Sequence, residues 1–187
     1  MCNPAPWAYT LNLLIGSDQL RAKALNCVAL LNLPDHYIAA GFVRNRVWDH
    51  LHGYTRATPL NDIDLIYFDP AEQDECRYLQ YEQQLRLMMP EVRWQVRNQA
   101  LMHLRNGDRP YQSSLDAMGF WPEKETAVGV RKDSTGRYIW VSAFGFESLF
   151  NLRLSHNPAR SETLFNERLQ SKRWLEIWPH LAVVKNP

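Results

Sequence analysis

The spacing of apolar residues divides the first part of the chain into a helix, a strand and a second helix. Apolar positions recur every three to four residues between residues 20 and 31, which is typical of an amphipathic helix. The short apolar run Tyr37–Ala40 leads into Gly41 and predicts a strand. The composition of residues 44–51 then predicts a helix that ends at Gly53.

A second apolar run carries two carboxylates. Residues 61–69 read Asn-Asp-Ile-Asp-Leu-Ile-Tyr-Phe-Asp, so Asp62 and Asp64 lie at the head of a predicted strand. Alternate strand residues point to the same face, which places the two Cα atoms about 6.5 to 7 Å apart. Apolar residues follow on both faces, so two unpaired carboxylates here would be costly. A divalent metal, an arginine partner or a solvent-open strand end would relieve that cost.

The remaining pattern predicts one more strand, a hairpin and several helices. Residues 92–97 alternate between an apolar and a polar face, and we expect this strand to pair with the one that carries Asp62. A turn sequence at 132–136 between two apolar runs predicts a β-hairpin. Helical or mixed segments are expected over residues 72–89, 98–104, 111–126, 147–154 and 161–178.

Length and composition indicate a globular protein of one domain. The chain has 187 residues, of which 45% are hydrophobic and 22% are charged. We expect a single domain over residues 1–187, with a core over about 15–130 and a C-terminal hairpin and helical elaboration over about 131–187. The formal net charge of +1 gives no general field to attract a polyanion, so tight nucleic-acid binding would need a local basic patch.

The chain shows no signal for a membrane or an oxidising compartment. Its apolar runs fall short of the roughly 18 residues that a membrane-spanning helix needs, and no basic signal-peptide region opens it. Cys2, Cys27 and Cys76 are scattered, without the spacing of a zinc site or a disulfide framework. We therefore expect a cytoplasmic protein with no membrane partner.

The order of these elements resembles the DNA polymerase β-like nucleotidyltransferase superfamily. Its members place a glycine at the start of a helix and Asp-x-Asp or Asp-x-Glu on the next strand. Here Gly41 takes the first place, and Asp62-Ile63-Asp64 takes the second. A little-characterised bacterial family of nucleotidyltransferase-like proteins is more closely similar, over most of residues 15–182. The segments that carry this closer likeness are Gly41–Asp49, Asp62–Asp69, Asn98–His103, Lys172–Trp174 and Trp178–Pro179.

The resemblance implies a fold and an activity. The fold would be α/β (α+β), with a mixed β-sheet flanked by helices and a C-terminal hairpin and helices. The activity would be Mg²⁺-dependent (or Mn²⁺-dependent) transfer of a nucleoside monophosphate from an NTP to an unidentified hydroxyl or phosphate acceptor. Asp62 and Asp64 would be the catalytic and metal-binding residues.

The nucleotide would lie near the glycine. A glycine lets the backbone approach a triphosphate closely, and amides at a helix start favour anions. The expected nucleotide-binding residues are Gly41, Phe42, Arg44 and Asn45. The alternatives are that Gly41 is only a turn glycine, and that Arg44 is a solvated residue or the partner of an aspartate.

Two departures from the superfamily bear on the activity, and the second, a missing third acid, weakens the case for catalysis more than the case for binding. Phe42 replaces the small residue that normally follows the glycine, and no third carboxylate is found on the neighbouring strand. That strand offers Arg93, Gln95 and Arg97 on the face opposite its apolar residues, while Glu91 and Asp69 are poorly placed to substitute. The competing hypothesis is therefore a catalytically impaired nucleotide-binding or sensor protein of the same fold.

Other polar and aromatic residues have simpler interpretations. Gln99 and His103 are four apart and could form a polar cluster with Asn98, although a helix cap and a packed histidine explain them equally. The helical spacing of Arg168, Lys172 and Arg173 is typical of a solvated face, with a nucleotide cleft as the alternative. We expect most tryptophans to pack in the core rather than to stack on bases. They are Trp48, Trp94, Trp121, Trp140, Trp174 and Trp178.

Overall fold

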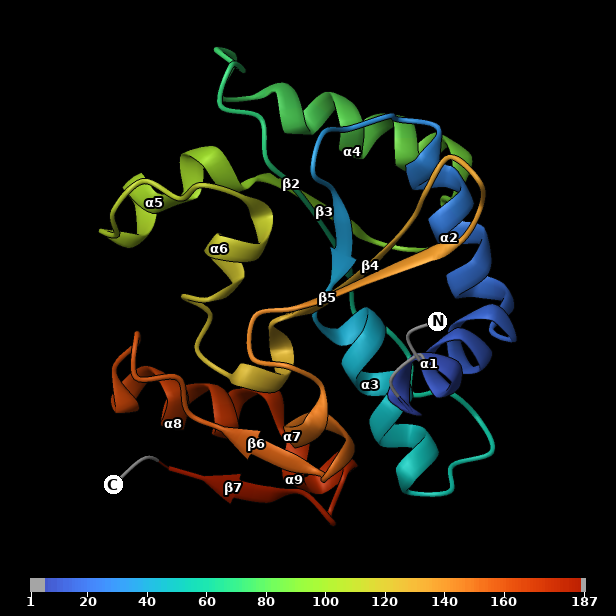
Figure 1. Cartoon of the computed structure of the whole chain (residues 1–187), viewed down its shortest axis with the longest axis vertical. Coiled ribbons are helices and arrows are strands. Elements are labelled where there is room, and N and C mark those ends of the chain that lie inside the picture. Colours follow the sequence, from blue (N-terminus) through green and yellow to red (C-terminus); the bar gives the residue numbers. More distant parts are fainter. Residues whose placement is uncertain (1–5, 186–187) are drawn as a thin grey trace.

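The centre of the molecule is a five-stranded mixed sheet (Figure 1). The computed structural model describes residues 6–185, so Cys2 lies outside the described residues. The strand order is β3–β2–β1–β4–β5, with β2 and β3 parallel and the other neighbours antiparallel. The strands are β1 (Tyr37–Ala39), β2 (Ile63–Tyr67), β3 (Trp94–Asn98), β4 (Val128–Lys132) and β5 (Tyr138–Ser142). The expected α/β class and the pairing of β3 with β2 are confirmed.

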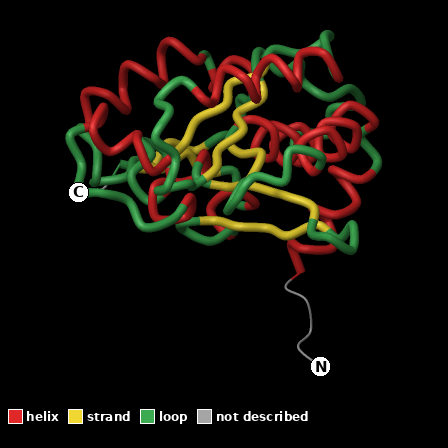
Figure 2. Tube along the Cα trace, turned by 90° about the horizontal axis from the view of Figure 1, so that it is seen from above, coloured by secondary structure: helices red, strands yellow, loops and turns green. Residues whose placement is uncertain are grey.

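Helices lie on both sides of this sheet, as the view from above also shows (Figure 2). In Figure 1, α2 and α4 lie on one side and α5 and α6 on the other. The helices are α1 (Pro6–Gly16), α2 (Gln19–Ala29), α3 (Gly41–Leu51), α4 (Arg77–Met88), α5 (Gln99–Asn106), α6 (Ser114–Met118), the 3₁₀ turn η1 (Lys124–Thr126), α7 (Glu147–Phe150), α8 (Glu162–Lys172) and α9 (Trp174–Ile177). None of the helices in the described part of the chain is long and apolar enough to cross a membrane.

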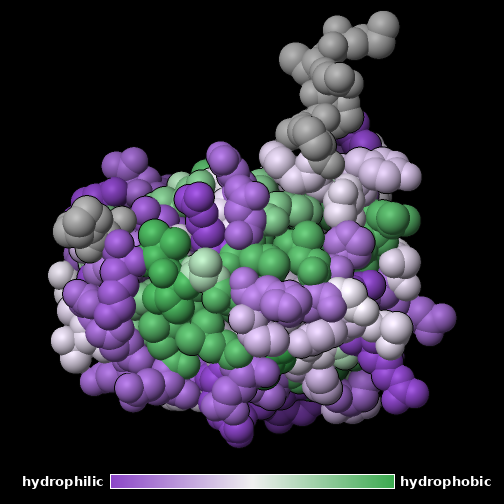
Figure 3. All heavy atoms as spheres, turned by 90° about the horizontal axis from the view of Figure 1, so that it is seen from below, coloured by the Kyte–Doolittle hydropathy of each residue, from purple (hydrophilic) through white to green (hydrophobic). Residues whose placement is uncertain are grey.

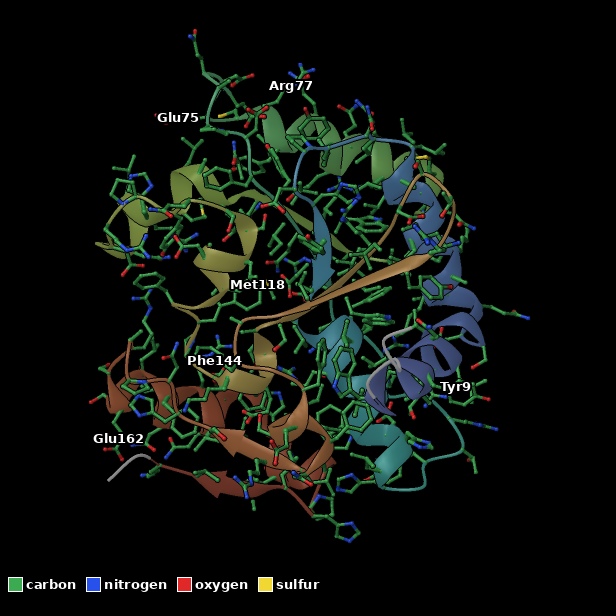
Figure 4. The ribbon with its side chains drawn as sticks, viewed as in Figure 1. Tyr9, Glu75, Arg77, Met118, Phe144 and Glu162 are labelled. Atoms are coloured by element: carbon green, nitrogen blue, oxygen red, sulfur yellow. The ribbon has the colours of Figure 1, made fainter. Side chains whose placement is uncertain are left out.

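The two faces of the sheet differ in how much apolar surface they bury. The alternating residues Ile63, Leu65 and Tyr67 of β2 point into the main core, together with side chains from α1, α2 and α4. Ile66 points the other way, into a small apolar cluster where α6 meets the sheet. Met118, the last residue of α6, belongs to this cluster (Figure 4). Because Asp64 shares the face of Ile66, the thinner packing on that face leaves room for a cleft.

The C-terminal part differs from the expected helices. Residues 147–154 were expected to be helical, but α7 ends at Phe150 and a strand β6 (Arg153–Ser155) pairs in parallel with β7 (Ala182–Val184). Leu152 adopts a φ of 51°, which breaks the helix before β6. The pairing joins segments nearly thirty residues apart in sequence, so local periodicity could not reveal it.

Seen from below, the molecule shows an apolar area bordered by polar residues (Figure 3).

The starts of two helices also depart from expectation. Helix α3 begins at Gly41 rather than at residue 44, and α4 begins at Arg77 rather than at residue 72. Before Arg77, the Asp74 carboxylate accepts from the Cys76 amide, a local turn that competes with helix. The hairpin joins the central sheet through β4, which pairs with both β1 and β5.

Candidate functional site

A strained residue turns the chain from β1 into α3. Ala40 has φ 56° and ψ −124°, a conformation that is costly for a residue with a side chain. The Ala40 amide donates to Val128 O at 3.0 Å, and its carbonyl accepts from the amides of Val43 and Arg44. These bonds hold the turn, and no side chain caps the helix that follows. The first amides of α3 are therefore free to bind an anion.

The two aspartates lie together beside this turn. Asp64 is the register partner of Ala39 on one side and of Gln95 on the other, so it occupies the middle of the sheet. Asp62 precedes β2, and both carboxylates are partly buried and line the same cleft as Gly41. The expectation that the pair projects to one face is confirmed.

The electrostatics of the pair favour a cation. Burial, followed by the negative charge of Asp62, raises the pKa of Asp64 from its usual 3.8 to about 6. Nearby Arg44 and Lys172 act in the opposite direction without cancelling the shift. Among residues 6–185, no group of three or more His, Cys, Asp or Glu side chains could hold a metal. Two carboxylates fit Mg²⁺, which usually takes one or two from the protein and keeps several waters.

Gln95 occupies the position where a third carboxylate was sought. Its Nε2 donates to Asp62 Oδ2 at 2.7 Å, and this orientation is required because an ionised carboxylate can only accept. The other two acids that were considered lie elsewhere. Glu91 pairs with the exposed Lys23 at 2.6 Å, and the Asp69 carboxylate accepts from the amide of Ala71. Neither lines the cleft.

Arg44 is a buried cation without a carboxylate partner among the described residues. Its side chain is 6% exposed, and its guanidinium carbon lies 5.0 Å from the Trp48 ring centre and 4.7 Å from that of Trp174. It donates to Asn45 Oδ1 and Thr126 Oγ1, and within the described chain no carboxylate forms an ion pair with it. Burial lowers the pKa of Arg44 to about 10, so it remains charged at neutral pH. Such a group is suited to binding an anion in the cleft.

The structure separates the other expected nucleotide-binding residues. Gly41 and Asn45 line the cleft, and a β-carbon on Gly41 would lie 3.4 Å from the Asn45 amide and 3.6 Å from Arg44 Nη2. The Phe42 side chain instead packs in the core, where it is 1% exposed. Its carbonyl accepts from Arg21 Nε at 2.8 Å, so only the Phe42 amide could contact a ligand.

The C-terminal helices supply the facing wall. Arg168 and Lys172, four apart on α8, both line the cleft, whereas Arg173 pairs with the exposed Glu176 outside it. The fully buried Glu123 holds Arg168 in place, with Nε–Oε1 at 2.5 Å and Nη2–Oε2 at 3.1 Å. The i,i+4 spacing of Arg168 and Lys172 was the sequence signal for this wall.

The cleft has a volume of about 800 Å³, within the range of small-molecule sites. Of the expected polar cluster, Gln99 lines the cleft, Asn98 caps α5, and His103 Nδ1 donates to Ala100 O. Three tryptophans, two of which are buried in the core, also contribute to the wall. They are Trp121, Trp174 and Trp178.

Buried Asp49 fixes the loop that leads to the acids. It accepts from the amide and the hydroxyl of Thr58 at 2.7 and 2.6 Å, and from Trp178 Nε1 at 2.9 Å. These bonds tie α3 both to the segment before Asp62 and to the C-terminal region. Asp49 is therefore a positioning residue, and sequence analysis gave it no role.

Comparisons with known proteins agree with this arrangement. Residues 26–183 match the sequence model of a family described as nucleotidyltransferase. A solved structure that reveals a CCA-adding enzyme head domain has 30% sequence identity and a TM-score of 0.83, over 95% of this chain and 96% of that one. A chain in a tRNA-processing enzyme complex has 13% identity and a TM-score of 0.49, over 87% of this chain and 43% of that one. This identity and this TM-score are too low to support an inference. No curated protein sequence matches.

Proposed function

This chain belongs to the nucleotidyltransferase family, and on that premise we propose that it is a Mg²⁺-dependent enzyme that binds an NTP in the cleft. The resemblance carried by Gly41 and Asp62-Ile63-Asp64 is confirmed at the level of the family. The family and the head-domain fold support nucleotidyl transfer in general. We further propose that the enzyme works in the cytoplasm, where nucleoside triphosphates are abundant.

The roles of the residues follow from their positions. Asp62 and Asp64 hold the metal ion (Mg²⁺, or Mn²⁺ in its place). When bound, the metal neutralises phosphate charge during transfer of the nucleoside monophosphate. Gly41 lets the triphosphate approach the first amides of α3, and Arg44 and Lys172 supply positive charge from two walls. The remaining side chains of the cleft wall would contact the nucleotide base and the acceptor.

The observation that carries this proposal is the meeting of opposite charges in one cleft. A carboxylate pair that favours a cation lies beside a buried arginine that has no carboxylate partner within residues 6–185. Metal-bound triphosphate satisfies both needs at once, since its metal meets the acids and its phosphates meet the arginine. A purely structural acid pair would instead be expected to form an ion pair with Arg44, and the two do not do so.

A thermal-shift screen tests this proposal. The full chain is heated with each NTP in the presence of Mg²⁺, Mn²⁺ or EDTA. At a ligand concentration about 100 times Kd, mass action adds about 2.7 kcal/mol of stability, so a bound nucleotide gives a clear rise in Tm. We expect this rise only with a metal present. Absence of a rise with every nucleotide and metal would refute the proposal.

Matched variants show whether Arg44 is responsible. Arg44→Gln should abolish most of the nucleotide-induced shift, because it removes the buried positive charge. Arg77→Gln is the control, since Arg77 is exposed at the start of α4 and lies at the outer edge of the molecule (Figure 4). Equal shifts in both variants would remove Arg44 from the site.

A second function, nucleotide binding without turnover, is favoured by one observation. Gln95 replaces a carboxylate beside Asp62, and an amide cannot accept a proton from an attacking group. A screen for pyrophosphate release from labelled NTP across a broad set of acceptors separates the two functions. Stoichiometric binding with no release would establish the binding or sensor protein.

The acceptor is the least constrained part of the reaction. The similar solved structure is described as revealing a CCA-adding enzyme head domain, so we propose that RNA ends belong in the acceptor screen. The near-neutral net charge of this chain does not favour polyanions in general. Any contact with RNA would therefore have to come from basic residues around the cleft.

A further inference from the structure

Resting on the proposed function, we propose that Arg168 donates hydrogen bonds to the triphosphate of the NTP and that buried Glu123 is the residue that positions it. Arg168 lies on α8 and lines the cleft, whereas Glu123 lies behind the cleft wall, directly before η1. The ion pair offsets the charge of Arg168, so this arginine contributes directed hydrogen bonds rather than net positive charge. Glu123 fixes those donors before the nucleotide binds.

The Glu123 carboxylate is committed to Arg168. Its side chain is fully buried, and it accepts from Arg168 Nε at 2.5 Å through Oε1 and from Nη2 at 3.1 Å through Oε2. Two bonds to one carboxylate fix the plane of the guanidinium, which a single bond would not do. Because the carboxylate has no access to water, the pair is held more firmly than a surface ion pair.

Arg168 keeps donors for a ligand. Glu123 occupies donors on Nε and Nη2 only, which leaves the N–H groups of Nη1. Within residues 6–185, no other group accepts a hydrogen bond from this guanidinium. The side chain is 30% exposed and lines the cleft. A phosphate oxygen can therefore be bound without breaking the ion pair.

Arg168 lies close to the groups that were assigned to the metal-bound triphosphate. Its guanidinium carbon is 5.8 Å from the ring centre of Trp174, and that of Arg44 is 4.7 Å from the same ring. Burial raises the pKa of Asp64, and the positive charge of Arg168 is among the influences that oppose this. A triphosphate whose metal is held by the acids would thus reach both arginines.

The 3₁₀ turn η1 sets the positions of both arginines. Thr126, at its end, accepts from Arg44 Nη1 at 2.5 Å, and Glu123, directly before it, accepts from Arg168. Glu125, between them, accepts from an amide and a hydroxyl of β6 at 2.7 and 2.8 Å, which anchors the turn. The side chains of Glu123, Glu125 and Thr126 are all buried. One anchored turn therefore fixes the spacing of two guanidinium groups that come from different helices, α3 and α8.

The direction of the change in affinity tests the role of Glu123. Glu123→Gln leaves the positive charge of Arg168 uncompensated, so a role of charge alone predicts tighter binding of the triphosphate. A positioning role predicts weaker binding, because the glutamine amide can accept through its oxygen only, and its NH₂ group cannot bond to the guanidinium. In calorimetric titration of the full chain, we expect Kd for Mg²⁺–NTP to rise about tenfold. A lower Kd would overturn the inference. An unchanged Kd with a lower Tm would show a purely structural ion pair and would overturn it as well.

Glu176→Gln is the matched control for the change in charge. Glu176 pairs with Arg173 just beyond the end of α8, and both residues are exposed and lie outside the cleft. This variant removes the same negative charge, so its Kd for Mg²⁺–NTP should equal that of the wild type. If both glutamate variants changed Kd by the same factor, net charge rather than the position of Arg168 would control binding, and the inference would fail.

Variants of Arg168 keep the test decisive if Glu123→Gln does not fold, which unfolding midpoints reveal. Arg168→Lys keeps the charge but replaces the planar fork with one ammonium group, so it should raise Kd about tenfold, as Arg168→Gln does. Wild-type affinity in Arg168→Lys would contradict the inference. The double variant Glu123→Gln/Arg168→Gln should bind no more weakly than Arg168→Gln alone, because Glu123 acts through Arg168. Additive losses would contradict this dependence.

Inorganic tripolyphosphate with Mg²⁺ shows which part of the nucleotide Arg168 contacts. It lacks the base and the sugar, so Arg168→Lys should weaken its binding by the same factor as that of the NTP. If only NTP binding weakened, Arg168 would act on the base or the sugar, and the inference would fail. A wild-type protein that bound neither ligand would refute the proposed function, and this inference with it, so the two failures are distinguishable.

Discussion

Replacing Asp64 by asparagine should stabilise the metal-free protein. The folded state raises the pKa of Asp64 from 3.8 to about 6, because the carboxylate is buried and close to Asp62. A raised pKa means that the folded state binds this proton more tightly than the unfolded state. The resulting stabilisation is complete below pH 3.8 and is lost as the pH rises through 6. At neutral pH the charged carboxylate therefore opposes folding.

The size of the effect follows from the shift in pKa. Moving a pKa from 3.8 to about 6 corresponds to about 3 kcal/mol at pH above 6. The cleft is open to water, which screens part of this, so we expect Asp64→Asn to gain about 1 to 2 kcal/mol at pH 7.5. For a chain of this length, that is a rise in Tm of about 3 to 6 °C. The gain should shrink towards zero as the pH falls below 5.

Thermal and urea unfolding in EDTA across pH 4.5 to 8 measures the effect. Asp133→Asn is the contrasting control, because hydrogen bonds from Thr135 and from Arg137 hold the pKa of Asp133 below its usual value. That carboxylate stabilises the fold at neutral pH, so its replacement should lower stability there. Adding Mg²⁺ should stabilise the wild type more than Asp64→Asn. An Asp64→Asn protein that is no more stable than wild type at pH 7.5, or whose gain is independent of pH, would refute the reasoning.

Three further variants test the cleft and its support. Gly41→Ala should keep the Tm of the wild type, because Gly41 lies in a helix and the new methyl group meets only side-chain ends at 3.4 to 3.6 Å. In calorimetric titrations the same variant should bind NTP about tenfold more weakly, or by about 1.4 kcal/mol. Asp49→Ala should lose about 3 kcal/mol or more in urea unfolding, because Trp178 Nε1 loses its buried acceptor; an unchanged midpoint would contradict this. Burial lowers the pKa of His36 below 6.5, so its contribution to stability is lost as the pH falls through 6.5. In the Asp64→Asn background, His36→Gln should therefore remove part of the acid sensitivity of unfolding between pH 7 and 5, and an unchanged pH dependence would show that His36 is not its source.

The core of the candidate site was accessible to sequence reasoning because its geometry is local. The period-two pattern of β2 predicted the common face of Asp62 and Asp64, and the order of strand, glycine and helix around Gly41 was predicted as well, although α3 begins at Gly41 rather than at residue 44. The lack of a third acid on β3 was also visible in sequence. What local pattern could not show was that Gln95 itself bonds to Asp62, since this depends on the register of two strands.

The surroundings of the site depend on contacts between distant segments. Arg44 has no carboxylate partner in the described part of the chain, and its guanidinium contacts two tryptophan rings, one of which, Trp174, is 130 positions along the chain. From the sequence, Arg44 could be a phosphate-binding residue, a solvated residue or the partner of an aspartate. The same holds for Lys172, whose helical spacing is typical of a solvated face but which lies in the cleft because α8 packs across it. Tertiary placement, rather than periodicity, decides these roles.

Calorimetric titration of Mg²⁺ and NTP into the wild type and into the Asp62→Asn/Asp64→Asn double variant tests the central claim most directly. The wild type should bind one nucleotide only when the metal is present, because we propose that Asp62 and Asp64, which line the cleft, hold the metal that carries the triphosphate. The double variant should remain folded and show no metal-dependent binding. Equal affinity of the two proteins for the nucleotide, with its metal dependence intact, would contradict the assignment of Asp62 and Asp64 as the metal-binding pair.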